Sequence, residues 1–166
     1  MPSRGCSDAA PRARPRRRRK PRLTLRLQVA SRAAPVPALA QVRRWARGAL
    51  KGSAEITVRI VGAAEARVLN RRYRDRDYAA NVLSFPYTLR RGMVQGDIVL
   101  CAPVIAREAL AQGKTVEAHL AHLTVHALLH LQGHDHFWRR DTARMEALEK
   151  KLLAKLGYPD PYDDSG

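Results

Sequence analysis

The six histidines of this 166-residue chain all lie between positions 119 and 136, and four of them follow a helical repeat. His119, His122, His126 and His130 are separated by three, four and four residues. Residues three or four apart lie on the same side of an α-helix, so the spacing predicts one stripe of imidazole rings. A buried imidazole needs polar partners, and four on one helix face therefore indicate binding or chemistry more than core packing.

The stretch "HALLHLQGHDH" at 126–136 has the spacing of a three-histidine metal site. His126 and His130 stand one helical turn apart, and Gly133 can take the left-handed conformation that ends a helix and turns the chain back. His136 then returns as a third ligand. Metzincin proteases have the same ligand spacing, but Ala127 stands where those enzymes have the glutamate that serves as general base.

Three imidazoles suit Zn²⁺ and leave its fourth position open, whereas structural zinc sites usually have four protein ligands. An open site lowers the pKa of a bound water to about 7. We therefore expect one zinc ion per chain, in a catalytic site. His119 and His122 can support the ligands or lie on the helix surface, and His134 faces elsewhere if His136 binds the ion. Asp135 can orient a ligand ring or bond the backbone of the turn.

The rest of the sequence alternates between strand and helix patterns. Period-two alternation and β-branched residues predict strands over residues 23–29, 54–62, 81–87 and 95–102. Apolar periodicity predicts helices over residues 38–50, 63–74, 104–112, 116–132 and 141–156. In the second helix Val68 and Leu69 are expected to face inward, and Thr115 is expected to cap the fourth. The pattern predicts an α+β fold: a single domain with a small mixed β-sheet flanked by helices, and a three-histidine metal site at a helix end and the following turn.

Positive charge is the strongest compositional signal, with a formal net charge of +16. Residues 1–22, which include "PRARPRRRRKPR", hold nine basic residues and one acidic residue, and so carry half of that charge. We interpret residues 1–22 as a disordered basic arm, 23–158 as the folded domain and 159–166 as a C-terminal tail. The charge suits a polyanionic partner, above all nucleic acid, although a basic surface can also serve solubility alone.

The sequence favours a cytoplasmic protein without a membrane partner. No apolar run approaches the roughly 18–20 residues that a membrane span needs. Only Cys6 and Cys101 are cysteines, which argues against a disulfide scaffold and fits a reducing cytosol. The arginine-rich start leaves an organellar transit peptide as the alternative.

Several further motifs, in a fixed order, resemble those of a known family. "LNRRYRDRD", "NVLSFP" and "GDIVL" precede the histidine stretch, "EAHLAH" leads into it and "LGYPDPY" follows it. Together they resemble the YbeY family of bacterial ribosomal RNA maturation factors, which are single-strand-specific, metal-dependent endoribonucleases. The resemblance covers about residues 54–162.

The resemblance implies that His126, His130 and His136 bind zinc and that Arg74, in "YRDRD", faces the metal cleft as the functionally important arginine. It also implies an α+β fold, processing of the 3′ end of small-subunit ribosomal RNA, and ribosome quality control. Ribosomal RNA and the small ribosomal subunit are the partners that it implies. The chain departs from the family at Ala79-Ala80, where Pro-Thr is usual, at His134, where Tyr is usual, and in its basic arm.

Arginines beside Arg74 are candidate RNA contacts. Arg71, Arg72 and Arg76 can bond phosphate oxygens bidentately, although a solvated helix face explains the first two equally well. Acidic residues in "YRDRD" can instead hold Arg74 and Arg76 by ion pairs. Phe85 can stack on an unpaired base as Tyr87 can, but core packing suits Phe85 better.

The mechanism expected from the sequence is metal-assisted cleavage of a phosphodiester, with Arg74 stabilising charge in the transition state. The sequence identifies neither the attacking nucleophile nor a general base. Two alternatives stay open. One is a metzincin-like, metal-dependent hydrolase of another substrate, and the other is a non-catalytic, metal-stabilised RNA-binding factor in ribosome assembly.

Overall fold

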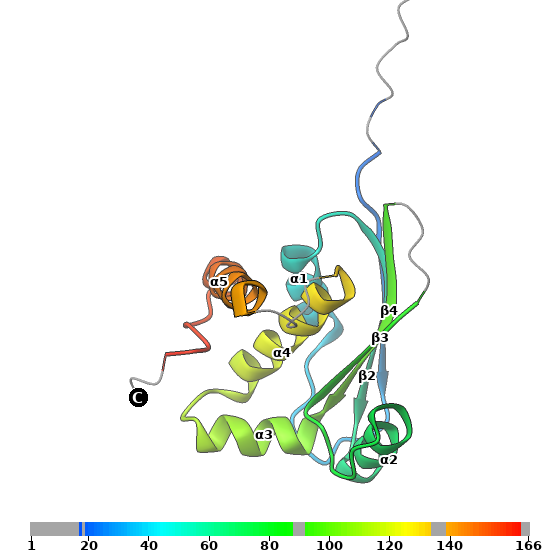
Figure 1. The fold of residues 1–166 in the computed structure, drawn as a ribbon, viewed down its shortest axis with the longest axis vertical. Helices are drawn as coiled ribbons and strands as arrows, with labels where there is room; N and C mark the ends of the chain where they lie inside the picture. The colour runs from blue at the N-terminus through cyan, green and yellow to red at the C-terminus, as the bar shows by residue number, and fades with distance from the viewer. Residues whose placement is uncertain (1–16, 18, 88–91, 134–138, 164–166) are drawn as a thin grey trace, which may run out of the picture.

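A four-stranded mixed sheet forms the centre of the computed structural model, which describes residues 17, 19–87, 92–133 and 139–163, with backbone alone for 139–141. The strands lie in the order β1 (Leu23–Val29), β2 (Ser53–Val61), β4 (Met93–Cys101) and β3 (Val82–Pro86). β1, β2 and β4 are parallel, and β3 pairs with β4 in the antiparallel direction at the sheet edge (Figure 1). The predicted mixed sheet is confirmed.

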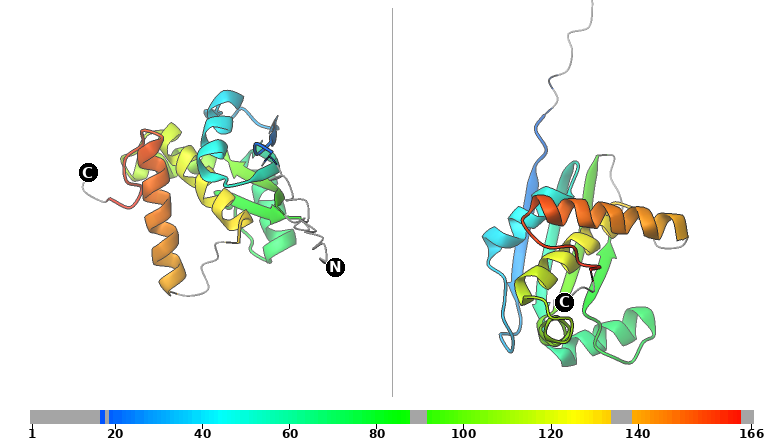
Figure 2. Two further views of the ribbon diagram at one scale, coloured as in Figure 1. Left: turned by 90° about the horizontal axis from the view of Figure 1, so that it is seen from above. Right: turned by 90° about the vertical axis from the view of Figure 1, so that its left-hand side faces the viewer.

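In the described part of the chain, five helices flank the sheet: α1 (Leu39–Ala49), α2 (Ala63–Arg74), α3 (Ala102–Ala111), α4 (Val116–Leu131) and α5 (Arg139–Lys155). α1 and α4 cover one face with α5 beyond them, while α2 packs against the opposite face (Figures 1 and 2). The predicted α+β class is therefore confirmed. Within the described residues, no helix combines the length and apolarity that a membrane crossing requires.

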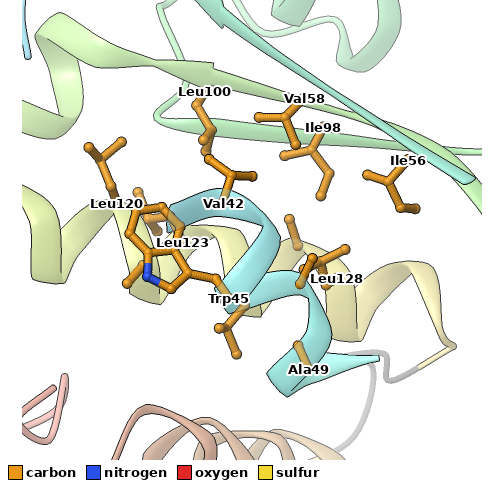
Figure 3. Packing of buried hydrophobic residues seen from close by; sticks show 14 of the residues in the cluster. Val42, Trp45, Ala49, Ile56, Val58, Ile98, Leu100, Leu120, Leu123 and Leu128 are labelled. Carbon is orange, nitrogen blue, oxygen red and sulfur yellow. The ribbon is translucent and has the colours of Figure 1, made fainter. Parts of the chain in front are cut away.

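The main core lies between the sheet and helices α1 and α4. Trp45 of α1 is fully buried in a cluster that also contains Ile56 and Ile98 of the sheet and Leu128 of α4 (Figure 3). Burying side chains of this size contributes about 1.5–3 kcal/mol each, which fixes α4 firmly against the sheet. This packing positions the helix that carries the histidines.

A smaller core joins α2 to the other face of the sheet. Ala66 packs there with Val61, Leu83 and Val99, and Leu69 lies against the same cluster. The expectation that Val68 faces inward is wrong, because its side chain is 62% exposed. Ala66 lies on the side of α2 that meets the sheet. Val68 is two residues further on, about 200° around the helix, and therefore faces solvent.

The two ends of α4 follow their sequence signals. The side chain of Thr115 accepts a hydrogen bond from the backbone N–H of Ala118 at 3.1 Å, which confirms the predicted cap. Gly133 has a φ of +90°, the left-handed conformation expected where the chain turns after the helix. Residues 134–138 lie outside the described residues, so the predicted return of His136 stays a prediction.

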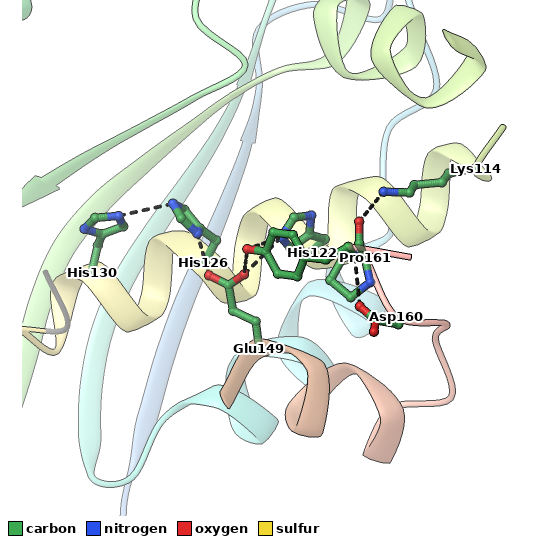
Figure 4. Close-up of polar contacts among 8 residues, drawn as sticks. Lys114, His122, His126, His130, Glu149, Asp160 and Pro161 are labelled. Carbon is green, nitrogen blue, oxygen red and sulfur yellow. Dashed lines mark hydrogen bonds and ion pairs between the residues drawn. The ribbon is translucent and has the colours of Figure 1, made fainter. Parts of the chain in front are cut away.

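The proposed domain boundaries 23–158 also stay a prediction, as does the disorder of residues 1–22. Among the described residues after 158, Pro161 is buried and its carbonyl accepts a hydrogen bond from Lys114 (Figure 4). Tyr162 donates a hydrogen bond to Glu149 of α5. This part of the chain is held against the folded body at both residues.

Candidate metal centre

The predicted stripe of imidazoles runs along one side of α4. Ring centroids are 6.1 Å apart between His119 and His122, 6.2 Å between His122 and His126, and 4.7 Å between His126 and His130. The rest of α4 is mostly buried, so the stripe follows from the way the helix packs into the core.

Glu149 of α5 is the polar centre of this stripe. Its side chain is 0% exposed and accepts a hydrogen bond from Nδ1 of His126 at 2.5 Å (Figure 4). Nε2 of His122 lies 3.1 Å from the other carboxylate oxygen, which also accepts from the hydroxyl of Tyr162. A fully buried carboxylate is stable only when donors surround it, and these three side chains supply them.

The three donors keep Glu149 ionised. Burial alone would raise the pKa of its carboxyl, but the hydrogen bonds from His122, His126 and Tyr162 outweigh burial and lower the pKa to about 2. An ionised carboxylate only accepts hydrogen bonds, so Nδ1 of His126 carries the proton of the neutral ring. The lone pair of His126 is then on Nε2, which points away from Glu149.

Nε2 of His126 lies 3.1 Å from Nε2 of His130. Two nitrogens that each lie about 2.0–2.1 Å from one tetrahedral ion are roughly 3.3 Å apart. The two rings are therefore spaced as ligands of a single ion, with His126 oriented by a carboxylate in the manner common for metal-binding histidines. The third predicted ligand, His136, lies outside the described residues.

A second set of donors also meets the distance requirement for a metal ion. Potential ligand atoms of His122, His126 and Glu149 all lie within 4.8 Å of one another. In this set, however, the two oxygens of Glu149 already accept hydrogen bonds, and the cluster is closed between α4 and α5. The two sets share His126, whose Nδ1 faces Glu149 and whose Nε2 faces His130.

An open cleft of about 540 Å³ is lined by His126 and His130. Its walls are Arg74 and Tyr73 of α2, residues 81–85 of β3 and the turn before it, and the rings of His126 and His130. Arg74, predicted from the sequence to face the metal, thus lines the same cleft as two of the predicted ligands.

The other predicted arginines have different surroundings. Arg71, Arg72 and Arg76 are exposed and do not line the cleft. Asp77 forms a bidentate ion pair at 2.7 and 3.0 Å, but its partner is Arg67, which precedes Arg74 by about two turns of α2. Asp77 therefore does not hold Arg74 or Arg76, contrary to one alternative drawn from the sequence.

His119 belongs to a hydrogen-bond network that reaches one wall of the cleft. Its Nε2 lies 2.8 Å from a carboxylate oxygen of Glu108, and Glu108 also accepts from the side-chain amide of Asn81 at 3.0 Å. Oδ1 of Asn81 accepts from the backbone N–H of Val82 at 2.7 Å, where β3 begins. The network ties α3 and α4 to the strand that forms one wall of the cleft.

Burial keeps His119 neutral. The ring is 4% exposed, and burial lowers its pKa more than Glu108 raises it. Nδ1 is buried without a hydrogen-bond partner among the described residues, so protonation there would place an N–H where nothing accepts it.

Glu149 was missed in the sequence analysis. The available signal is a charged residue inside an apolar helical stripe, because Met145, Glu149 and Leu153 are spaced four apart and all three are buried. A lone carboxylate at such a position indicates a buried polar partner elsewhere in the chain. The sequence could not say that the partner is the histidine stripe.

Comparison with known proteins places the chain in a family. The family model described as "Endoribonuclease YbeY" matches residues 35–157. Proteins named "Endoribonuclease YbeY" from Aromatoleum aromaticum and Thiobacillus denitrificans are 58% identical over 126 residues and 52% identical over 143 residues. These alignments cover 76% and 86% of this chain, and 81% and 97% of the two relatives.

A solved structure shares the fold. The solution structure of TM1509 from Thermotoga maritima superposes with a TM-score of 0.55 at 19% sequence identity, over 84% of this chain and 99% of that one. With the match over residues 35–157 and two relatives more than half identical, this chain belongs to the endoribonuclease YbeY family.

Proposed function

We propose that this protein is a metal-dependent endoribonuclease that cleaves single-stranded RNA during maturation of ribosomal RNA. The observation that carries the proposal is the shared cleft, which Arg74 lines together with His126 and His130, whose Nε2 atoms lie 3.1 Å apart. The cleft combines a candidate metal centre with a permanently charged group suited to phosphate. The names of the relatives identify RNA as the substrate class.

His126, His130 and His136 are the residues that we assign to a zinc ion. The cleft-side pair is preferred over the set of His122, His126 and Glu149, because substrate and water can reach only an open position. A divalent ion held at the cleft would polarise a phosphoryl oxygen and lower the pKa of a coordinated water. Glu149 would orient His126 and keep its proton on Nδ1, away from the cleft.

Arg74 would hold the scissile phosphate. A guanidinium donates two parallel hydrogen bonds to phosphate oxygens and so fixes the orientation of the phosphodiester as well as stabilising its charge. Removing one such contact typically costs about 10²–10³ in rate. Arg74→Ala is expected to lose cleavage on that scale while folding is unchanged, and Arg74→Lys to recover only part of it, since lysine lacks the planar fork.

Neither alternative reading is favoured. Ala127 occupies the position of the metzincin base and is fully buried in the core, so peptide hydrolysis in that manner lacks its proton acceptor. A non-catalytic assembly factor has no need of a cleft that joins Arg74 to the histidines. The family to which the chain belongs is named for endoribonuclease activity.

The cellular role that we propose is processing of the 3′ end of small-subunit ribosomal RNA and quality control of ribosomes in the cytoplasm. The small ribosomal subunit would be the partner. Exposed Arg71, Arg72 and Arg76, together with the basic residues of 1–22, would add non-specific attraction to phosphates.

The test is cleavage by the purified full-length protein before chelation, after chelation and after zinc is restored. Labelled single-stranded RNA, duplex RNA of the same sequence, and casein are the three substrates. We expect only single-stranded RNA to be cut, and only by the metal-loaded protein. Undiminished RNA cleavage after complete metal removal, or hydrolysis of casein, would contradict the proposal. Arg74→Ala assayed in parallel guards against a contaminating nuclease.

A further inference from the structure

A second hollow, of about 320 Å³, is lined by residues of α2 and of the sheet. α2 lies on the opposite face of the sheet from α4 and α5, which carry the metal centre (Figures 1 and 2). Tyr73 and Phe85 line both this hollow and the cleft. Their rings meet edge to face, with centroids 5.0 Å apart and planes at 67°. The rings of Tyr73 and Phe85 therefore form an aromatic wall between the hollow and the cleft, at the edge strand β3.

The hollow has the surfaces that a nucleobase requires. Tyr87 and Phe85 offer aromatic faces, and the Tyr87 ring is held by a hydrogen bond from its hydroxyl to Asp97. Tyr73 is 58% exposed and Tyr87 53% exposed, so both rings can be reached from solvent. Gln28 and Thr57 add polar groups on the floor formed by the sheet.

Among the described residues, the charges that line the hollow select against phosphate. Glu65 and Asp97 both line it, while Arg59 is the one guanidinium that the described part of the chain contributes, and it is already paired with Glu65 at 2.8 Å. A phosphate there would lie near two carboxylates and one guanidinium that is already paired with a carboxylate. A neutral base meets no such repulsion, and its amino and imino groups can bond to carboxylate, amide and hydroxyl groups.

We propose that this hollow binds one unpaired base of the RNA strand whose phosphate lies in the cleft. The inference rests on the proposed function, since it takes the occupant to be the substrate strand. The chain of that strand would cross the aromatic wall at β3, with its phosphates on the arginine side of α2 and one flanking base turned into the hollow. A base held in a duplex cannot turn out in this way without unpairing, so the hollow gives a physical origin for a preference for single strands.

The experiment measures binding of a fluorescent single-stranded RNA to the metal-free protein, so that cleavage is not needed for the readout. Tyr87→Ala removes an aromatic face, and Gln28→Trp fills the hollow from the exposed side of β1. Thr24→Trp is the matched control, because Thr24 is exposed on the same face of β1 and does not line the hollow. None of these residues lines the cleft.

Loss of one base stack is worth about 1–3 kcal/mol, so Tyr87→Ala and Gln28→Trp should bind roughly 5- to 150-fold more weakly, with melting temperatures near that of wild type. Thr24→Trp should bind as wild type does. An RNA with one abasic nucleotide, moved stepwise along the strand, should show one sensitive position in wild type and none in Tyr87→Ala.

Equal binding by Tyr87→Ala, Gln28→Trp and wild type would overturn the inference. So would competition by a free nucleoside monophosphate as strong as that of the RNA strand, because the occupant would then be a mononucleotide. The proposed function fails differently, by an absence of metal-dependent cleavage in a protein that still binds RNA with the predicted pattern.

Discussion

Replacing Glu149 with glutamine tests whether this residue orients the metal ligand His126 or only stabilises the fold. Glu149 is fully buried and receives hydrogen bonds from His126, His122 and Tyr162. Glutamine has nearly the same shape, but its amide nitrogen cannot accept a hydrogen bond. At least one of the three donors must lose its partner, or His126 must change the nitrogen that carries its proton.

The expected magnitudes follow from that loss. A hydrogen bond to a charged group contributes about 1.5–3 kcal/mol, and for a chain of this size each kcal/mol is worth roughly 2–4 °C of melting temperature. Glu149→Gln should therefore melt about 3–12 °C lower. Losing the carboxylate that orients a metal-binding histidine typically weakens metal affinity by about 10–100-fold.

The assay is zinc affinity by competition with a chromogenic chelator, measured on protein shown to be folded, together with melting of the metal-free protein. Glu146→Gln removes the same charge from the same helix and leaves the three donors of Glu149 in place, so its zinc affinity should match wild type. The reasoning is refuted if Glu149→Gln melts lower but binds zinc as tightly as wild type, because Glu149 would then be purely structural.

Three further predictions concern pH, packing and the basic arm. Burial lowers the pKa of His119 below the ordinary histidine value of about 6.5. Its neutral form therefore contributes stability that is fully present above about pH 6.5 and is lost as pH falls below that value toward the lower pKa of the folded state. The difference in unfolding free energy between wild type and His119→Gln, from urea titrations at pH 5 to 8, should shrink on acidification, and a constant difference would contradict this. A Cβ on Gly96 would lie 2.8 Å from the backbone oxygen of Phe85 and 2.8 Å from a methyl of Leu131. Gly96→Ala should therefore lower the free energy of unfolding, measured with denaturant, by about 1–3 kcal/mol. Gly52→Ala is the control, because the atom nearest to its Cβ would be 3.6 Å away, and it should unfold nearly as wild type does. Deleting residues 1–22 should lower the slope of log affinity for RNA against log salt concentration without changing zinc content, and an unchanged slope would show that the arm does not contact RNA.

Local signals in the sequence were enough to predict most elements of the fold. Thr115 and Gly133 mark the two ends of α4 as expected, and period-two alternation locates the strands to within a few residues. These signals act over one or two turns, so the sequence contains them in full. The orientation of α2 was not predictable in the same way, and Val68 proved exposed because Ala66 rather than Val68 meets the sheet.

The candidate site was predictable where its residues are neighbours in the sequence. The spacing of His126 and His130 on one helix fixes their 3.1 Å approach. Arg74 could be associated with them only through family resemblance, since the cleft forms from α2, β3 and α4 together. Glu149 reaches His126 across 23 positions of sequence, and no local pattern connects a carboxylate on one helix with a ring on another.

The most direct test of the central claim is the amount of zinc bound per chain in two single variants. His130 belongs only to the cleft-side set of ligands, and His122 only to the buried set with Glu149. The account predicts that His130→Ala retains little zinc, while His122→Ala retains nearly the amount bound by wild type. Full zinc in His130→Ala together with its loss in His122→Ala would contradict the account, because the ion would then sit in the closed cluster rather than in the cleft beside Arg74.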